Sequence, residues 1–228
     1  EITYGDWSSD VCSSDLVRGL RTSAWPDAAV DLDLRRGEVV GIAGLLGAGR
    51  TELLRALFGA DRPLAGAIEC AGVALAGHTP AQAAAAGLVL VPEDRKLQGL
   101  VLAMNVRENL SLPTLHTRGA WVDRGYEREL VERSIRELGI ATPHGEQHAG
   151  ALSGGNQQKV VIAKWLVQQS EVLIFDEPTR GIDVGAKQEI YKLINELAAQ
   201  GRAIILISSE LPEILQISHR IAVMCEGR

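Results

Sequence analysis

The chain is built around the motif ALSGGNQQK at residues 151–159. This motif places Ser153 and two glycines, Gly154 and Gly155, where a helix is predicted to begin and to continue through residues 160–167. Serine is a preferred helix N-cap, and glycines let an anion approach the backbone N–H groups at a helix start. The motif therefore predicts a phosphate-binding helix N-terminus.

A second motif is the short apolar run VLIF at residues 172–175, which ends at Asp176 and Glu177. A run of this length is typical of a buried strand that delivers the next residues to one edge of a parallel sheet. Carboxylates at such an edge suit Mg²⁺ and general-base catalysis. We therefore expect Asp176 to bind a metal ion and Glu177 to act in catalysis.

A third motif, GLLGAGRT at residues 44–51, lies between a predicted strand (residues 39–43) and a predicted amphipathic helix (residues 52–58). Glycines in such a loop let successive N–H groups face a phosphate, and a hydroxyl at its end can bind Mg²⁺. Arg50 stands where this pattern usually has a lysine, and its wider, planar guanidinium binds anions in a different place. The residues expected to contact the nucleotide are Gly44, Leu45, Leu46, Gly47, Ala48, Gly49, Arg50 and Thr51, and Thr51 is also the expected second metal ligand.

In this order along the chain, the loop, the glycine pair and the acidic strand end resemble the Walker A, signature and Walker B motifs of ABC transporter nucleotide-binding domains. The resemblance implies an α/β P-loop NTPase fold with a parallel-sheet core, an antiparallel β subdomain and an α-helical subdomain at about residues 100–160. Apolar residues recur every three or four positions at 104–110 and 126–138, which predicts helices there. The resemblance also implies ATP and Mg²⁺ as cofactors.

The resemblance gives roles to three further residues. Glu93 holds the place of the Q-loop glutamine, Ser209 that of a histidine that binds the γ-phosphate, and Asp183 lies in the D-loop, which crosses the dimer interface. An anionic Glu93 beside a triphosphate is unfavourable unless Mg²⁺ or Arg95 offsets it. Alternatively, residues 92–96 form a solvated charged loop. The implied catalytic residues are Glu177, Ser209 and Glu93, and the implied contacts to a nucleotide across the interface are Leu152, Ser153, Gly154, Gly155, Asn156, Gln157 and Asp183.

The departures from the family pattern are unevenly distributed. Arg50, Glu93 and Ser209 all fall on the site that the chain builds with its own Walker motifs, whereas the signature keeps the pattern. In the family, two domains meet head to tail, and each Walker face binds ATP against the signature of the other domain. We therefore hypothesise that the chain's own site is degenerate, while residues 152–157 complete the partner's site, where ATP is chiefly hydrolysed.

Longer motifs narrow the resemblance: VPEDRK at residues 91–96, EPTRGIDVGAK at 177–187 and SSELPE at 208–213. They resemble the C-terminal nucleotide-binding half of the tandem ATPase subunit of bacterial importers for ribose, xylose, galactose or arabinose. The implied partners are the N-terminal nucleotide-binding half of the same subunit, membrane permease subunits and, indirectly, a periplasmic sugar-binding protein. The implied location is peripheral, at the cytoplasmic face of the bacterial inner membrane.

Other functions stay open at this point. Nucleoside importers have a similar tandem ATPase, and a non-catalytic regulatory domain would bind nucleotide without turning it over. A soluble ABC ATPase acting on ribosomes or DNA would need a basic surface, but the formal net charge is −6, so nucleic acid is not an expected partner. A GTPase is disfavoured because no guanine-reading motif follows the phosphate loop.

Residues 1–16 fit neither helix nor strand periodicity and resemble a translated sequencing adapter, with an ordinary polar tail as the alternative. We therefore expect one nucleotide-binding domain over residues 17–228, truncated at both ends. Because this leader holds four acidic and no basic residues, leaving it out changes the formal net charge from −6 to −2.

Three further features of the sequence carry weaker expectations. Trp25 is the only candidate for an adenine-stacking aromatic residue, but its register is poor, and a partly packed surface tryptophan is the preferred interpretation. Cys12, Cys70 and Cys225 lie far apart and are expected to be free thiols. No apolar run approaches the length of roughly 18 residues that a membrane-spanning helix needs.

Overall fold

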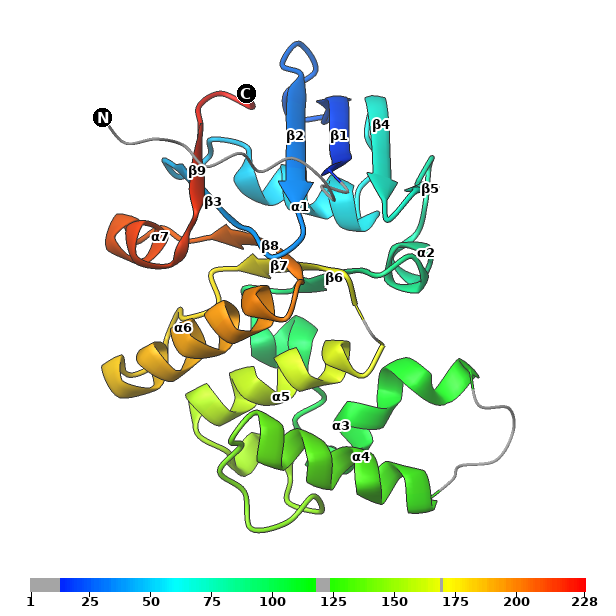
Figure 1. Cartoon of the computed structure of the whole chain (residues 1–228), viewed down its shortest axis with the longest axis vertical. Helices are drawn as coiled ribbons and strands as arrows, with labels where there is room; N and C mark the ends of the chain where they lie inside the picture. Colours follow the sequence, from blue (N-terminus) through cyan, green and yellow to red (C-terminus); the bar gives the residue numbers. More distant parts are fainter. Residues whose placement is uncertain (1–12, 118–123, 169) are drawn as a thin grey trace, which may run out of the picture.

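The computed structural model describes residues 13–117, 124–168 and 170–228, which form two β-sheets and the helices around them. A five-stranded parallel sheet in the order β6-β7-β8-β3-β9 lies across the middle of the molecule, and a four-stranded antiparallel sheet in the order β2-β1-β4-β5 lies above it (Figure 1). The parallel strands are β3 (Val39–Gly44), β6 (Leu88–Val91), β7 (Val172–Asp176), β8 (Ala203–Ile207) and β9 (Arg220–Met224). The antiparallel strands are β1 (Ser13–Arg21), β2 (Val30–Arg35), β4 (Ala65–Cys70) and β5 (Val73–Ala74).

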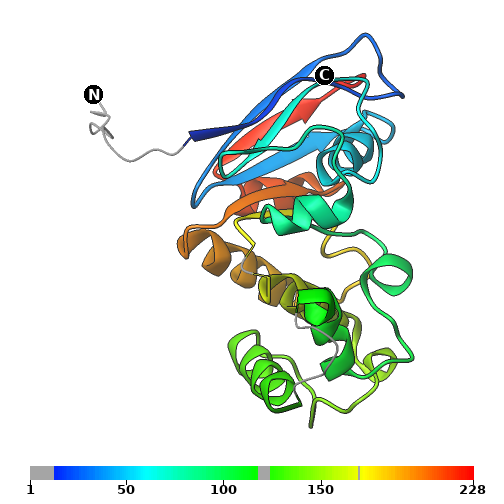
Figure 2. The same cartoon turned by 90° about the vertical axis from the view of Figure 1, so that its right-hand side faces the viewer.

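The helices cover both faces of the parallel sheet and form a helical end. Helix α1 packs between the two sheets, whereas α5, α6 and α7 pack on the opposite face of the parallel sheet. Helices α3 and α4 lie beyond α5, at the end remote from the antiparallel sheet (Figures 1 and 2). The helices are α1 (Arg50–Phe58), α2 (Pro80–Ala85), α3 (Val106–Ser111), α4 (Arg124–Glu137), α5 (Gly154–Leu166), α6 (Val184–Ala199) and α7 (Leu211–Ile217), with a π-helix η1 (Arg95–Gly99) and 3₁₀ turns η2 (Leu112–Thr117) and η3 (Ala149–Ala151).

Alternate residues of the central strands face two separate hydrophobic cores. In β7, Leu173 and Phe175 belong to the core formed with α5 and α6, whereas Val172 and Ile174 face the core beneath the antiparallel sheet. Successive side chains of a strand point to opposite faces, and a parallel strand covered on both faces is apolar throughout. The structure thus confirms the predicted α/β fold, with its parallel core, antiparallel sheet and helical part.

Strand β1 corrects the expectation that the fold begins at Val17. The strand pairs with β2 from Ser13 onward, and Leu16 within it is only 1% exposed. The last four residues of the expected leader, 13–16, are therefore part of the fold. Residues 1–12 lie outside the described residues, and the adapter origin of the leader stays a prediction.

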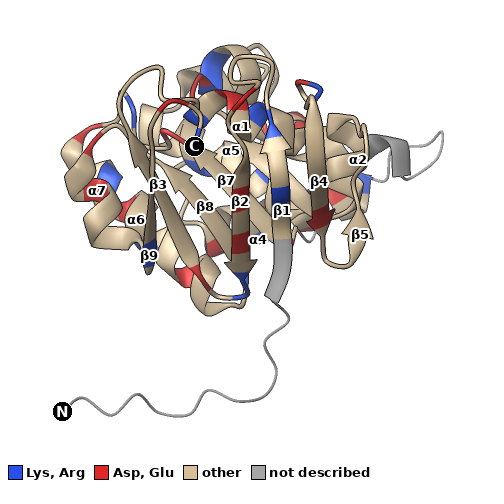
Figure 3. Cartoon of the chain, turned by 90° about the horizontal axis from the view of Figure 1, so that it is seen from above, with Lys and Arg blue, Asp and Glu red and all other residues tan. Residues whose placement is uncertain are grey.

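Charged residues of both signs are spread over the strands and helices in the view of Figure 3. Some of them join elements that are distant in the sequence: Arg220 of β9 forms ion pairs with Asp33 of β2 at 3.2 Å and with Glu38 at 2.9 Å. Within residues 13–117, 124–168 and 170–228, no helix has both the length and the apolar character needed to cross a membrane.

Candidate nucleotide-binding site

The glycine-rich loop connects β3 to α1 and leaves the start of this helix open. Gly47 and Gly49 have φ angles of 80° and 99°, which glycine adopts at little cost. Gly49 is the N-cap of α1, and no described side chain caps this nine-residue helix. The first N–H groups of α1 and the positive end of its dipole therefore stay available to an anion, as a phosphate loop requires.

Arg50, the first residue of α1, is buried beneath this loop. Its side chain reaches the end of β8, where Nη1 donates a hydrogen bond to the backbone oxygen of Ser208 at 3.0 Å. The guanidinium thus links the phosphate loop to the strand end that carries Ser209. Anion binding by Arg50 stays a prediction.

A cavity of about 320 Å³ opens at the carboxyl end of β7 and is lined by Thr51, Glu93 and Asp176, among others. Asp176 is 6% exposed, and its Oδ1 is buried without a hydrogen-bond partner among the described residues. Burial and the neighbouring Glu177 raise the pKa of Asp176 to about 6, and Arg50 lowers it in part. A buried carboxylate oxygen with no partner is costly, and a cation at this position would relieve that cost.

Any metal ion at this cavity would take few ligands from the protein. The described residues contain no group of three or more His, Cys, Asp or Glu side chains that could hold a metal ion. Mg²⁺ commonly uses one or two protein oxygens and completes its octahedron with phosphate oxygens and water. Asp176, which carries the unpaired oxygen, and Thr51, which carries a hydroxyl, are both among the residues that line this cavity, and they fit this donor set.

Glu177 and Ser209 meet where β7 and β8 end. The Ser209 hydroxyl donates a hydrogen bond to Oε2 of Glu177 at 3.1 Å, and the Glu177 N–H donates to the Ile207 oxygen at 3.0 Å. Glu177 has a φ of 46°, a left-handed conformation that costs a non-glycine residue about 1–2 kcal/mol. The structure therefore brings together the predicted catalytic residues Glu177 and Ser209, and it places Glu93 in the adjoining cavity.

The signature motif forms the start of α5, as predicted. Ser153 is the N-cap, and its hydroxyl accepts hydrogen bonds from the Asn156 N–H at 3.4 Å and from Asn156 Nδ2 at 2.8 Å. Gln157 is buried and donates to the backbone oxygen of Leu152 at 3.2 Å. None of residues 152–157 is among the residues that line the cavity containing Asp176.

A match to a known family covers these elements. The ABC transporter family matches residues 28–180, a range that contains the glycine-rich loop, the signature motif and the acidic end of β7. The chain belongs to the ABC transporter family. This confirms the resemblance that the three motifs indicate.

Two curated relatives are named for sugar import. The chain is 57% identical over 201 residues to "Ribose import ATP-binding protein RbsA 2" of Streptomyces coelicolor, covering 87% of the chain and 39% of the relative. It is 54% identical over 216 residues to a protein of Burkholderia ambifaria provisionally named ribose/galactose/methyl galactoside import ATP-binding protein 3. This match covers 93% of the chain and 42% of the relative. The chain thus spans about two fifths of the length of these relatives.

A solved ABC cassette has the same fold. It is the dimeric post-hydrolysis state of the ATP-binding cassette MJ0796 bound to ADP and phosphate, with a TM-score of 0.76 and 19% identity. The match covers 92% of this chain and 94% of that one. The likeness supports the ABC fold alone.

Glu93, in the expected Q-loop, pairs with a residue that the sequence analysis did not name. It forms an ion pair with Arg180, which follows the Walker B strand. Arg95, named beside Mg²⁺ as a charge that could offset Glu93, donates to the backbone oxygens of Arg180 at 2.9 Å and Gly181 at 3.3 Å. Arg180 therefore compensates the charge of Glu93, and the loop contacts the turn at residues 180–181 while Asp94 and Lys96 stay exposed.

Asp183, in the expected D-loop, caps the following helix. Its side chain accepts a hydrogen bond from the Ala186 N–H at 3.0 Å, as the N-cap of α6. Capping accounts for Asp183 within one chain, and its contact with nucleotide across an interface stays a prediction.

Sequence reasoning missed the buried carboxylate of Glu213 on α7. This carboxylate accepts hydrogen bonds from four side chains: Thr179 Oγ1 at 2.7 Å, Ser208 Oγ at 2.7 Å, Lys187 Nζ at 2.9 Å and Tyr191 OH at 2.5 Å. Burial raises the pKa of Glu213, but these hydrogen bonds outweigh it and hold the pKa below its ordinary value. Glu213 therefore joins the segment after Walker B to the strand end beside Ser209. The only signal in the sequence is an acidic residue next to the apolar Ile214 in a short helix.

Trp25 lies against the phosphate loop. A Cβ at Gly49 would lie 3.0 Å from Nε1 of Trp25, and Trp25 itself is half-buried. This position fits the partly packed surface tryptophan that we preferred. Adenine stacking on Trp25 stays a prediction.

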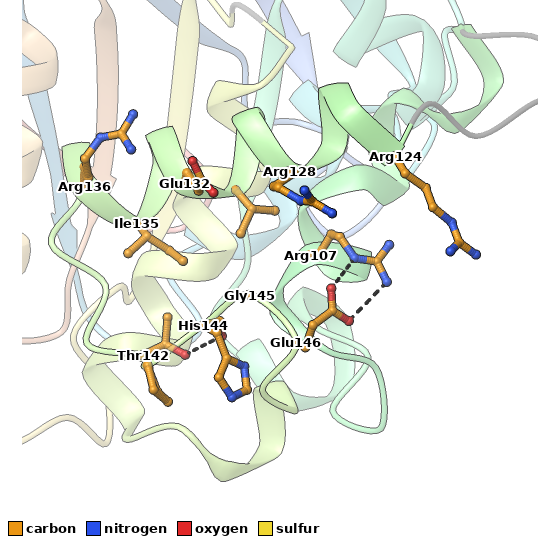
Figure 4. Close-up of a pocket in the computed structure, with 12 residues that line it drawn as sticks. Arg107, Arg124, Arg128, Glu132, Ile135, Arg136, Thr142, His144, Gly145 and Glu146 are labelled. Carbon is orange, nitrogen blue, oxygen red and sulfur yellow. Dashed lines mark hydrogen bonds and ion pairs between the residues drawn. The ribbon is translucent and has the colours of Figure 1, made fainter.

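A second cavity, of about 660 Å³, lies between α4 and the segment that follows it (Figure 4). Arg107 projects into it from α3 and forms ion pairs with Glu127 and Glu146, at 2.7 Å each. None of the predicted site residues lines this cavity. It is therefore separate from the candidate nucleotide site.

Proposed function

We propose that the chain is the second ATP-binding half of the ATPase subunit of a bacterial monosaccharide importer. The observation that carries nucleotide binding is the unpaired Oδ1 of Asp176, which shares a cavity with Thr51 below the uncapped start of α1. Such a site suits a magnesium-bound polyphosphate. Sugar import is supported by the names of the relatives, which are more than 50% identical to the chain.

In this proposal, ATP binds with its phosphates at the N–H groups of residues 44–51. Asp176 and Thr51 would hold Mg²⁺, which when bound would supply positive charge to offset that of the phosphates. Glu177 is the general base for the attacking water, and the hydroxyl of Ser209 fixes the position of its carboxylate through their 3.1 Å hydrogen bond.

Three residues support impaired hydrolysis at this site. Arg50 is held under the loop by its hydrogen bond to Ser208 rather than extending freely toward the phosphates. Ser209 stands where the family has a histidine, and a serine hydroxyl is too short and uncharged to replace it. Glu93 brings a negative charge to the cavity, although Arg180 compensates it.

The intact signature then serves a second site. Ser153, Gly154 and Gly155 form the start of α5, whose N–H groups suit a γ-phosphate. None of these residues lines this chain's Asp176 cavity. We therefore propose that they close over the Walker face of the N-terminal half of the same subunit, where most ATP is hydrolysed.

A groove of about 800 Å³ supports contact with a membrane permease subunit. It lies where α1, α2 and the helical end meet, and Phe58, Leu112, Pro113, Tyr126 and Trp165 are among its lining residues. Apolar grooves of this kind accept a helix of a partner. Through the permease, the subunit would be peripheral at the cytoplasmic face of the inner membrane, and a periplasmic binding protein would deliver the sugar.

Uptake by reconstituted proteoliposomes tests the transport function. The full-length subunit, its permease and its binding protein are assembled, and ATP-driven accumulation of labelled ribose, galactose and nucleosides is compared. Our proposal predicts uptake of a monosaccharide that depends on internal MgATP. Accumulation of nucleosides alone would assign the chain to a nucleoside importer, and nucleotide binding with no turnover in the assembled complex would favour a regulatory domain.

A further inference from the structure

In the loop after β6, hydrogen bonds hold the backbone on both sides of Arg95. The Asp94 side chain accepts hydrogen bonds from the N–H groups of Lys96 at 2.9 Å and Leu97 at 3.0 Å, and so caps η1. The Arg95 oxygen accepts from the Leu100 N–H at 2.8 Å, which closes the π-turn. The backbone of Arg95 is therefore held on both sides, and its side chain starts from a defined position.

The Arg95 guanidinium forms hydrogen bonds to the turn at residues 180–181, which follows Walker B. Nη1 and Nη2 donate to two successive backbone oxygens, those of Arg180 at 2.9 Å and of Gly181 at 3.3 Å. The side chain of Arg180 returns to the same loop through its ion pair with Glu93. The Q-loop and the D-loop are thus joined by backbone and side-chain contacts together.

The same guanidinium also lies against the signature motif. A Cβ built on Gly154 would come within 2.8 Å of Nη2 of Arg95 and 3.5 Å of the Gly181 oxygen. Gly154 is the first residue of α5, so the first turn of the signature helix packs directly on Arg95 and the turn it holds. One side chain therefore contacts the D-loop and the signature at once.

We propose that Arg95 is a positioning residue that sets the signature helix against the D-loop, and so aligns the half-site that this chain offers to its partner domain. The inference rests on the proposed function, in which the signature completes the partner's site. The planar fork of arginine reaches two carbonyl oxygens with parallel N–H groups, and the single ammonium of lysine does not.

Steady-state ATP turnover by the complete transporter tests this role. We expect Arg95→Gln and Arg95→Lys each to lower kcat about tenfold, with KM for ATP changed less than about twofold, because the signature N–H groups matter most in the transition state. Lys96→Gln is the matched control: it removes the same charge from the next, exposed residue and should keep the normal kcat. Thermal unfolding and assembly of each variant are measured beside turnover.

A wild-type kcat in the folded, assembled Arg95→Gln transporter would overturn the role of Arg95. Full rescue by Arg95→Lys would overturn it too, because charge alone would then suffice. If Arg95→Gln does not assemble, Arg95→Lys decides, since it retains the charge.

A double-mutant cycle gives a second readout that general destabilisation would not produce. Gly154→Ala adds a methyl group 2.8 Å from Nη2 of Arg95 and should lower kcat about fivefold. In the Arg95→Lys background, which lacks this guanidinium, the same change should have little further effect. Additive effects would contradict a direct contact between the two residues in the working enzyme.

Gly154→Asp separates this inference from the function on which it rests. If Gly154→Asp leaves turnover unchanged, the signature does not complete a hydrolytic site, and the proposed function fails. If Gly154→Asp abolishes turnover while Arg95→Gln behaves like Lys96→Gln, only the role of Arg95 fails.

Discussion

At the scale of single residues, Asp176 shows a conflict between stability and function. Its carboxylate is buried beside Glu177, and Oδ1 has no hydrogen-bond partner within the described residues. Both conditions destabilise the free protein, and a bound cation would remove them. The residue that suits Mg²⁺ best is therefore one that the fold alone does not favour.

Asp176→Asn is predicted to stabilise the chain in the absence of nucleotide. The pKa of Asp176 is raised from 3.8 to about 6 in the folded state, so ionisation costs stability as the pH rises through this window. At pH 7 the variant should gain about 2 kcal/mol in the free energy of unfolding, and the gain should vanish below about pH 4, where the carboxyl is protonated in both states. Denaturant unfolding of the full-length subunit at several pH values measures this.

The matched control is Asp61→Asn. The hydrogen bond from Arg55 lowers the pKa of Asp61, so its ionised form stabilises the fold, and its removal should act in the opposite direction. Asp176→Asn should also abolish the Mg²⁺ dependence of ATP binding at this site. Unchanged stability at pH 7, or Mg²⁺-dependent binding that persists, would contradict our account of Asp176.

The sequence predicted those site residues that lie within short motifs and missed those created by tertiary contacts. Ser153 and the pair Asp176 and Glu177 follow directly from a cap position and a strand end. Glu213 collects donors from four separate positions, and no local pattern encodes that arrangement. The ion pair between Glu93 and Arg180 was not predicted for the same reason, because Arg180 is distant in the sequence.

At the scale of elements, strong periodicity and clear boundaries made the central strands and longer helices predictable. Strand β7 is apolar between polar neighbours, and α5 begins at a serine cap. Strand β1 was not predicted, because Ser13 to Leu16 have no strand periodicity of their own and are ordered by pairing with β2. Helix α7 was missed since it is only seven residues long.

The contact between α5 and α6 depends on a glycine. A Cβ at Gly155 would lie 2.7 Å from the Cβ of Ala186, closer than two carbon atoms can pack. Gly155→Ala should therefore lower the free energy of unfolding by about 1–3 kcal/mol through overpacking. Ala186→Gly in the same protein should restore most of the loss, because it removes the opposing methyl group.

Gly185→Ala is the control for that experiment. It lies in the first turn of α6, and the nearest atom to a new Cβ is Asp183 Oδ1 at an ordinary 3.4 Å. The better helix propensity of alanine should make this change neutral or slightly stabilising. Equal losses from Gly155→Ala and Gly185→Ala, measured by urea unfolding, would show that the packing of α5 on α6 is not responsible.

At the scale of the whole molecule, our proposal distinguishes two half-sites. The Walker loop, Asp176, Glu177 and Ser209 meet at the carboxyl edge of the parallel sheet, whereas the signature begins the helix that leads into the helical end. In our proposal, the residues that depart from the family pattern, Arg50, Glu93 and Ser209, belong to the first half-site. Our account therefore assigns most of the turnover to the partner's Walker face and this chain's signature.

The most direct test of that asymmetry compares two substitutions in this half of the complete transporter by their effect on ATP turnover. We predict that Gly154→Asp abolishes turnover, because it adds a bulky, negatively charged side chain to the first turn of α5, whose N–H groups we propose to bind the γ-phosphate, whereas Glu177→Gln leaves most of it. If Glu177→Gln is as damaging as Gly154→Asp, then Arg50, Glu93 and Ser209 are tolerated in a working site, and the asymmetric account is wrong.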